Sequence, residues 1–172
     1  MGKLMKTNFM RLCSILLWFP IYFSSLNSSA APKPFSIVSK IGSDQTVAQD
    51  LDNNGITFPN KSGKWIVLNY WADWCGPCKR EIPALNEFYK NNQDKVIFVS
   101  VHTDLLDQKD LKKIARNLNI QFPMLQSDPL KLVGALEGTP STYFISPLGQ
   151  VYGPLLGPQN ERSLLKAIQQ FS

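Results

Sequence analysis

Residues 65–78 read WIVLNYWADWCGPC, an apolar run of seven residues followed closely by two cysteines. The run from Trp65 to Trp71 has the length and continuous hydrophobicity of a strand that is buried on both faces. A helix is expected from about Cys75 to Asn91, because apolar side chains recur there with helical spacing from Ile82 onward. The cysteine pair therefore lies where a buried strand passes into a helix.

The rest of the chain continues this alternation of apolar runs and amphipathic segments. The order predicts an α/β domain with parallel strands first and an antiparallel hairpin last. The further elements that we expect are strands at 96–101, 122–125, 142–145 and 151–156, and helices from about 107, from 128 and over 160–171.

Length and charge exclude several classes of protein. The 172 residues are enough for one domain with a short appendage, and a composition that is 44% hydrophobic excludes a disordered chain. The net charge is +5, from 18 Lys and Arg against 13 Asp and Glu. Three of those bases and no acid fall within residues 1–30, so 18 − 3 = 15 bases face 13 acids in the remainder. No basic stripe is left for nucleic acid, and we expect none as a partner.

Residues 1–30 have the order of a signal peptide: basic residues, then an apolar stretch, then small polar residues. They predict either a signal that is cleaved after Ala30 or an N-terminal membrane anchor that is retained. We therefore expect an exported protein of the bacterial periplasm, either soluble or anchored to the inner membrane. Residues 31–62 are interpreted as an N-terminal extension and residues 63–172 as the core domain. Cleavage would remove Cys13 and leave one closely spaced pair, Cys75 and Cys78.

That pair suits redox chemistry. The N-terminus of a helix carries unpaired N–H groups and a partial positive charge, which stabilise a thiolate in preference to a thiol. Cys75 is thus the expected nucleophile, and Cys78, one turn further on, is placed to attack a mixed disulfide. Gly76 permits a close approach, and Pro77 fits the first helical turn.

The motif Trp74-Cys75-Gly76-Pro77-Cys78 resembles the active site of thioredoxin. Pro83 matches the position of that family's helix kink, and Thr139-Pro140 matches its cis-proline loop. The resemblance implies a three-layer α/β/α sandwich around a central mixed sheet. It also implies that Pro140 is cis and faces Cys75, with Thr139 offering backbone groups to an incoming peptide strand.

Within that fold the chain resembles the exported reductases of the TlpA, ResA and DsbE group more closely than the cytoplasmic thioredoxins. The signal segment, an extra helix and strand over 107–125, and Glu81 carry this likeness. It implies that Glu81 assists proton transfer; the alternative is a solvated residue of the first helical turn. It further implies substrate proteins with disulfides, such as apocytochrome c, and a membrane electron donor of the DsbD or CcdA type.

Three other residues near the motif are interpreted separately. Asn69 replaces the buried acid of cytoplasmic thioredoxins, and we expect a buried, hydrogen-bonded amide that cannot act as a base. Trp74 is either a platform for substrate or simple packing at the rim of the site. His102 is interpreted as a surface loop residue.

Several other functions remain open. A disulfide oxidant or isomerase would use the same cysteines with a different redox potential. A copper carrier would use them as soft ligands, but such a site needs further ligands, and the sequence has one histidine. We expect no cofactor and no resident metal. The leading hypothesis is an exported thiol:disulfide oxidoreductase that works as a reductase.

Overall fold

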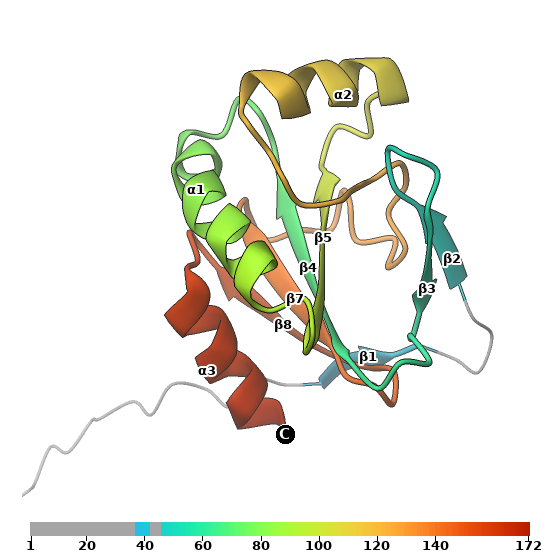
Figure 1. Ribbon diagram of the computed structural model, residues 1–172. Helices are drawn as coiled ribbons and strands as arrows, with labels where there is room; N and C mark the ends of the chain where they lie inside the picture. The colour runs from blue at the N-terminus through green and yellow to red at the C-terminus, as the bar shows by residue number, and fades with distance from the viewer. Residues whose placement is uncertain (1–36, 42–45) are drawn as a thin grey trace, which may run out of the picture. The chain divides into compact units, whose positions relative to one another are not determined.

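The predicted strand at residues 65–71 is present as β4 (Trp65–Trp71), an inner strand of the main sheet (Figure 1). This computed structural model describes residues 37–41 and 46–172, so the expected export segment, 1–30, lies outside it. Every residue of β4 after Trp65 is buried. The continuous hydrophobicity of this run thus reflects a strand that is covered on both faces.

Five more strands complete the main sheet, in the order β1-β8-β7-β4-β5-β6. Strands β4, β5 and β6 are parallel, whereas β7, β8 and β1 join antiparallel to their neighbours. The predicted mixed sheet is therefore confirmed. The bounds are β1 (Ile37–Lys40), β5 (Val96–His102), β6 (Met124–Leu125), β7 (Ser141–Ile145) and β8 (Gln150–Leu156).

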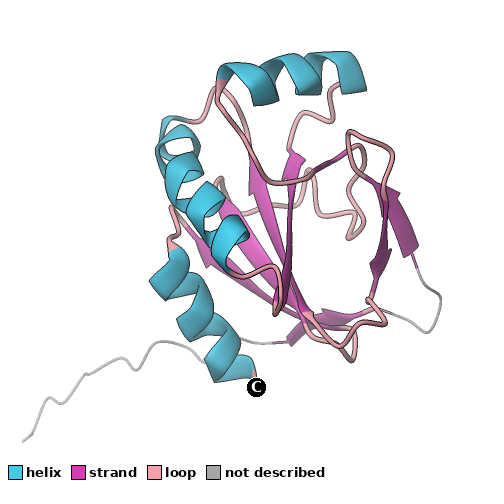
Figure 2. Ribbon diagram, viewed as in Figure 1, coloured by secondary structure: helices cyan, strands magenta, loops and turns pink. Residues whose placement is uncertain are grey.

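Three helices are present among the described residues: α1 (Gly76–Asn91), α2 (Gln108–Asn117) and α3 (Glu161–Phe171) (Figure 2). Each begins after a side chain that accepts a backbone N–H of the first turn: Cys75, Asp107 and Asn160. Helices α1 and α3 contact one another and pack on one face of the sheet (Figure 1). The core on this face includes Val67, Phe98, Phe144, Ile82, Leu85, Leu111 and Leu164.

The other face of the sheet buries Leu68, Val99 and Ile145. It is covered by a second, two-stranded sheet and by the segment 130–136. Strands β2 (Thr46–Gln49) and β3 (Gly55–Phe58) pair antiparallel and contribute Ala48 and Phe58 to this core. The extension at 31–62 thus supplies one strand to the main sheet and a hairpin to its face.

The predicted short helix from Asp128 is wrong, because the segment forms turns instead. The Asp128 carboxylate accepts hydrogen bonds from the backbone N–H groups of Leu130 (3.0 Å) and Val133 (2.8 Å). It also accepts one from the hydroxyl of Tyr70 (2.6 Å). An aspartate that binds nearby backbone in this way stabilises turns in competition with a helix.

No helix among the described residues has the length and apolar character that crossing a bilayer requires.

Candidate active site

Cys75 and Cys78 lie at the start of α1 and are joined in a disulfide. Cys75 is the N-cap residue, and its Sγ accepts the backbone N–H of Cys78 at 3.2 Å. The two cysteines are 5% and 1% exposed, respectively. A helix terminus and a directed N–H group both favour negative charge on the Cys75 sulfur.

Gly76 and Pro77 form the first turn between the cysteines, and Pro77 occupies a position where a missing N–H costs no helical bond. A Cβ added at Gly76 would meet only the end of the Arg80 side chain, at 3.5 Å. The chain itself therefore does not require glycine at position 76.

The Thr139-Pro140 peptide bond is cis, as the resemblance to thioredoxin implied. The carbonyl oxygen of Thr139 lies 3.7 Å from Sγ of Cys75. Strand β7 begins next, with Ser141 opposite Tyr70 of β4. Sheet pairing thus brings the segment at Cys75 and the segment at Thr139, 64 residues later, together beside the disulfide.

Glu81 is 3% exposed, so the alternative of a solvated side chain is wrong. Its Oε1 accepts the amide of Asn69 at 3.1 Å, and its Oε2 accepts the backbone N–H of Gln159 at 2.7 Å. Burial raises the pKa of this carboxyl to about 7, although both hydrogen bonds act in the opposite direction. Glu81 is thus a buried acid, one turn after Cys78, that can exchange a proton near neutral pH.

Asn69 is a buried amide on β4, as expected. Besides Glu81 it donates to the hydroxyl of Thr142 at 3.3 Å. It therefore links β4, α1 and β7 through one side chain.

Trp74 is 65% exposed, and its indole N–H donates to Oδ2 of Asp104 at 2.9 Å. The ring is thus a large apolar surface beside Cys75, tied at one point to the segment that follows β5.

The prediction that His102 lies on the surface is wrong. It is the last residue of β5, pairs in register with Trp71, and is 1% exposed. Its ring meets that of Trp71 edge to face, with centroids 5.2 Å apart. Strand β5 extends one residue further than expected, and this places the imidazole under the loop before Cys75.

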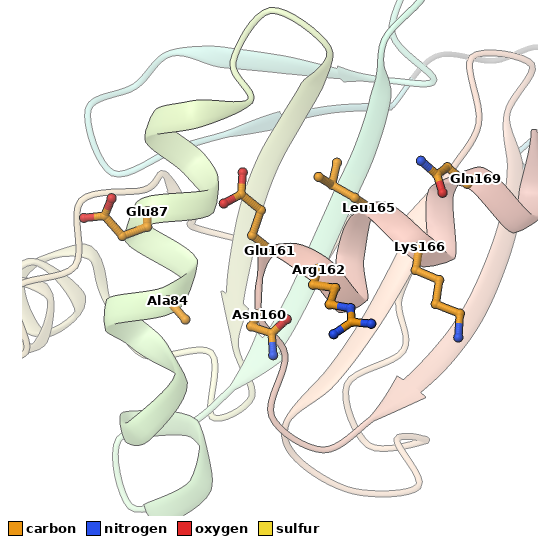
Figure 3. A pocket seen from close by; sticks show the side chains of 8 residues that line it. All are labelled: Ala84, Glu87, Asn160, Glu161, Arg162, Leu165, Lys166 and Gln169. Atoms are coloured by element: carbon orange, nitrogen blue, oxygen red, sulfur yellow. The ribbon is translucent and has the colours of Figure 1, made fainter.

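Asp73, His102 and Asp104 form the one group of three possible metal-ligating side chains found among the described residues. Neither cysteine belongs to it, so it does not provide the soft ligands that the copper hypothesis needs. A separate surface hollow lies between α1 and α3 (Figure 3). Its lining contains none of the predicted site residues: Ala84, Glu87, Asn160, Glu161, Arg162, Leu165, Lys166 and Gln169.

Two contributors to the site were missed from the sequence, Gln159 and Asp104. Gln159 acts through a backbone N–H, which leaves no signal in residue type. Asp104 follows closely on the carboxyl end of a parallel strand, and that position could have indicated it, because such ends gather at one edge of a sheet.

Comparison with known proteins gives one matching family model. Residues 43–153 match the AhpC/TSA family, which is more than half of the chain.

Individual relatives extend the comparison. The thiol-disulfide oxidoreductase ResA of Bacillus cereus is 26% identical over 129 residues, covering 73% of this chain and 74% of ResA. The crystal structure of StoA from Bacillus subtilis aligns with a TM-score of 0.61 at 23% identity, covering 72% of this chain and 95% of StoA. The thioredoxin domain of thiol-disulfide oxidoreductase BVU-2223 from Bacteroides vulgatus aligns with a TM-score of 0.58 at 22% identity, covering 79% of this chain and 99% of that domain. These structures share the thioredoxin-like α/β fold.

Proposed function

Because the chain belongs to the AhpC/TSA family, we propose that it is an exported thiol:disulfide oxidoreductase that reduces disulfides in substrate proteins. One observation carries the proposal. The Sγ of Cys75 caps α1, accepts the N–H of Cys78 at 3.2 Å and lies 3.7 Å from the Thr139 carbonyl. A nucleophilic sulfur is thereby held between a charge-stabilising helix end and the backbone of the half-buried Thr139.

In the first step, the Cys75 thiolate of the reduced protein attacks one sulfur of a substrate disulfide. A mixed disulfide forms, and the other substrate sulfur leaves as a thiolate that takes up a proton. In the second step, the Cys78 thiolate attacks Sγ of Cys75. The Cys75–Cys78 disulfide forms and the second substrate thiol is released, so that two electrons have passed from the protein to the substrate.

Glu81 is proposed to accept the proton of Cys78 in the second step. Its pKa of about 7 suits a base that works at neutral pH. Asn69 is uncharged and donates to Glu81, so it orients the carboxylate rather than taking the proton.

Substrate polypeptide is proposed to lie across Trp74, Gly76 and Pro77 and to pair with the backbone of Thr139 next to Pro140. Trp74 offers exposed apolar area, and Thr139 is half-buried beside the reacting sulfur. An extended peptide can add main-chain hydrogen bonds at such an edge.

The reducing direction rests on the Gly76-Pro77 pair, which is shared with thioredoxin, whose potential is about −270 mV. Return to the dithiol then needs two electrons from a reductant, for which we propose a membrane protein of the DsbD or CcdA type. Export through residues 1–30 and a role in reducing apocytochrome c belong to the same proposal. Inner-membrane attachment applies if that segment is retained.

Trapping of mixed disulfides in the native compartment tests this function. Cys78→Ser should accumulate Cys75-linked complexes with proteins that carry paired cysteines, identified by mass spectrometry. Cys75→Ser is the matched control and should trap far less. Equal trapping by both variants would contradict the assigned roles, and a potential above about −150 mV would indicate an oxidant instead.

A further inference from the structure

The buried imidazole of His102 lies between two stretches of backbone at the active-site end of the sheet. Its Nδ1 is 3.2 Å from the backbone nitrogen of Asp104. Its Nε2 is 3.1 Å from the backbone nitrogen of Asp73 and 3.3 Å from Oδ1 of the same residue. The ring thus bridges the segment after β5 and the loop that leads into Cys75.

The groups around the ring favour one position for its proton. Backbone N–H groups face both ring nitrogens, that of Asp73 at Nε2 and that of Asp104 at Nδ1, and the acceptor that the structure gives to the ring is Oδ1 of Asp73, 3.3 Å from Nε2. With the proton on Nε2, the ring donates to that carboxylate and Nδ1 accepts the Asp104 N–H, while the Asp73 N–H lies against a donor. With the proton on Nδ1, the ring N–H would face the Asp104 N–H and would have no acceptor. The Nε2–H form therefore gives each ring nitrogen a partner.

The segment 102–104 makes two more contacts with the same loop. The backbone N–H of Thr103 donates to the carbonyl of Trp71 at 2.9 Å, and Asp104 accepts the indole N–H of Trp74 at 2.9 Å. The residues that segment 102–104 contacts, Trp71, Asp73 and Trp74, all lie within four residues of Cys75 in the sequence. The end of β5 thus acts as a clamp on the loop 71–74.

We propose that His102 is a positioning residue and, with Asp104, determines how well substrate polypeptide binds beside Cys75. The imidazole fixes the backbone of Asp104, whose carboxylate in turn holds the Trp74 ring in one orientation. A fixed aromatic surface loses less conformational entropy when a partner binds than a mobile one does. The effect on substrate rests on the proposed oxidoreductase function; the geometry of the clamp does not.

The single histidine in the sequence makes a direct test possible. A long-range ¹H–¹⁵N spectrum of the untagged full chain should show protonated Nε2 and unprotonated Nδ1. The Trp74 indole signal, identified with Trp74→Phe, should shift and exchange faster with solvent in both His102→Phe and Asp104→Leu. Proton on Nδ1, or an unchanged indole signal in both variants, would overturn the proposal.

Kinetics separate positioning from simple packing. His102→Phe keeps a ring against Trp71 but loses the hydrogen bonds made by the two ring nitrogens. With insulin as the disulfide-bonded substrate, we expect KM to rise about tenfold and kcat to stay within about twofold of wild type. His102→Asn retains an acceptor near the place of Nδ1 and should recover most of the loss. Asp94→Leu, an exposed aspartate before β5 begins, is the control for Asp104→Leu and should leave KM unchanged.

A fall in thermal stability without any rise in KM would show that His102 only packs the core, and would overturn its proposed role. If wild-type protein fails to reduce insulin at all, the proposed function is contradicted. The spectrum of the His102 ring nitrogens and the Trp74 indole signal still test the clamp in that case, because neither measurement depends on catalysis.

Discussion

The carboxylate of Glu81 accepts the backbone N–H of Gln159 at 2.7 Å, across 78 residues of sequence. This bond ties the active-site helix α1 to the loop between β8 and α3. The side chain of Gln159 donates to the carbonyl of Gly157 (2.7 Å), and the N–H of Gly157 donates to the carbonyl of Pro140 (2.9 Å). The buried acid and the cis-proline loop therefore belong to one hydrogen-bonded network.

The first prediction concerns stability and pH. The pKa of Glu81 is raised from 4.5 to about 7 on folding, so the folded protein binds more protons than the unfolded chain between these values. Its contribution is fully present below pH 4.5 and is lost as pH rises through 7. The free energy of unfolding should thus fall by about 3 kcal/mol from this group between about pH 4 and about pH 8.

Glu81→Gln should remove that part of the pH dependence, measured by urea unfolding of the oxidised protein across the same pH range. Glu87→Gln changes an exposed glutamate of the same helix and should keep the wild-type curve. Parallel curves for wild type and Glu81→Gln would show that the buried carboxyl does not titrate as described.

The second prediction concerns the rate of resolution. If the ionised carboxylate takes the proton of Cys78, release of substrate from the mixed disulfide should accelerate with pH through an inflection near 7. Glu81→Gln should lose this inflection and slow the step by about ten- to a hundredfold at neutral pH. Stopped-flow single turnovers from a preformed mixed disulfide measure it, and an unaltered profile would exclude Glu81 as the base.

Much of this fold could be predicted from sequence because its signals are local. The apolar run at 65–71, the helix starts expected near 107 and 160, and the hairpin formed by β7 and β8 each depend on a few adjacent residues. The helix expected from Asp128 does not form because its carboxylate binds the backbone N–H groups of Leu130 and Val133, and these local bonds compete with a helix. The hydroxyl of Tyr70, 58 residues earlier, adds a contact to the same carboxylate that the local sequence does not indicate.

The site residues also fall into those that the local sequence indicates and those whose surroundings depend on distant segments. The cysteines and Pro140 are marked by residue type and spacing. The structure joins the cysteines in a disulfide and places the carbonyl of Thr139, the residue before Pro140, 3.7 Å from Sγ of Cys75. The burial of Glu81 and His102 depends on what covers them, namely the loop at Gln159 and the loop before Cys75. The packing of these two loops over Glu81 and His102 cannot be inferred from the residues that flank either side chain in the sequence.

A third prediction uses Asn69, which faces Glu81 at 3.1 Å. Asn69→Asp would place two carboxyl groups in contact within the core, and both cannot ionise without strong repulsion. We expect a loss of about 3 kcal/mol or more in unfolding free energy at about pH 8, and a much smaller loss at about pH 5, where one shared proton is retained. Asn69→Ala is the control, since the unfolding free energy that it loses should depend less on pH. An equal cost for Asn69→Asp at both pH values would contradict the interaction.

The last prediction concerns Asp128, whose carboxylate accepts from the Tyr70 hydroxyl and from the backbone of Leu130 and Val133. Asp128→Ala leaves the buried hydroxyl of Tyr70 without this acceptor, and should lower the free energy of unfolding by about 2 to 4 kcal/mol. Tyr70→Phe removes the hydroxyl itself, so the double variant should lose less unfolding free energy than the sum of the two single changes.

The same carboxylate fixes the turns that lead to Thr139. Hydrogen exchange over 129–138 should therefore quicken in Asp128→Ala and much less in Tyr70→Phe. Additive energies, or exchange that is unchanged in Asp128→Ala, would show that the segment is held by its apolar contacts instead.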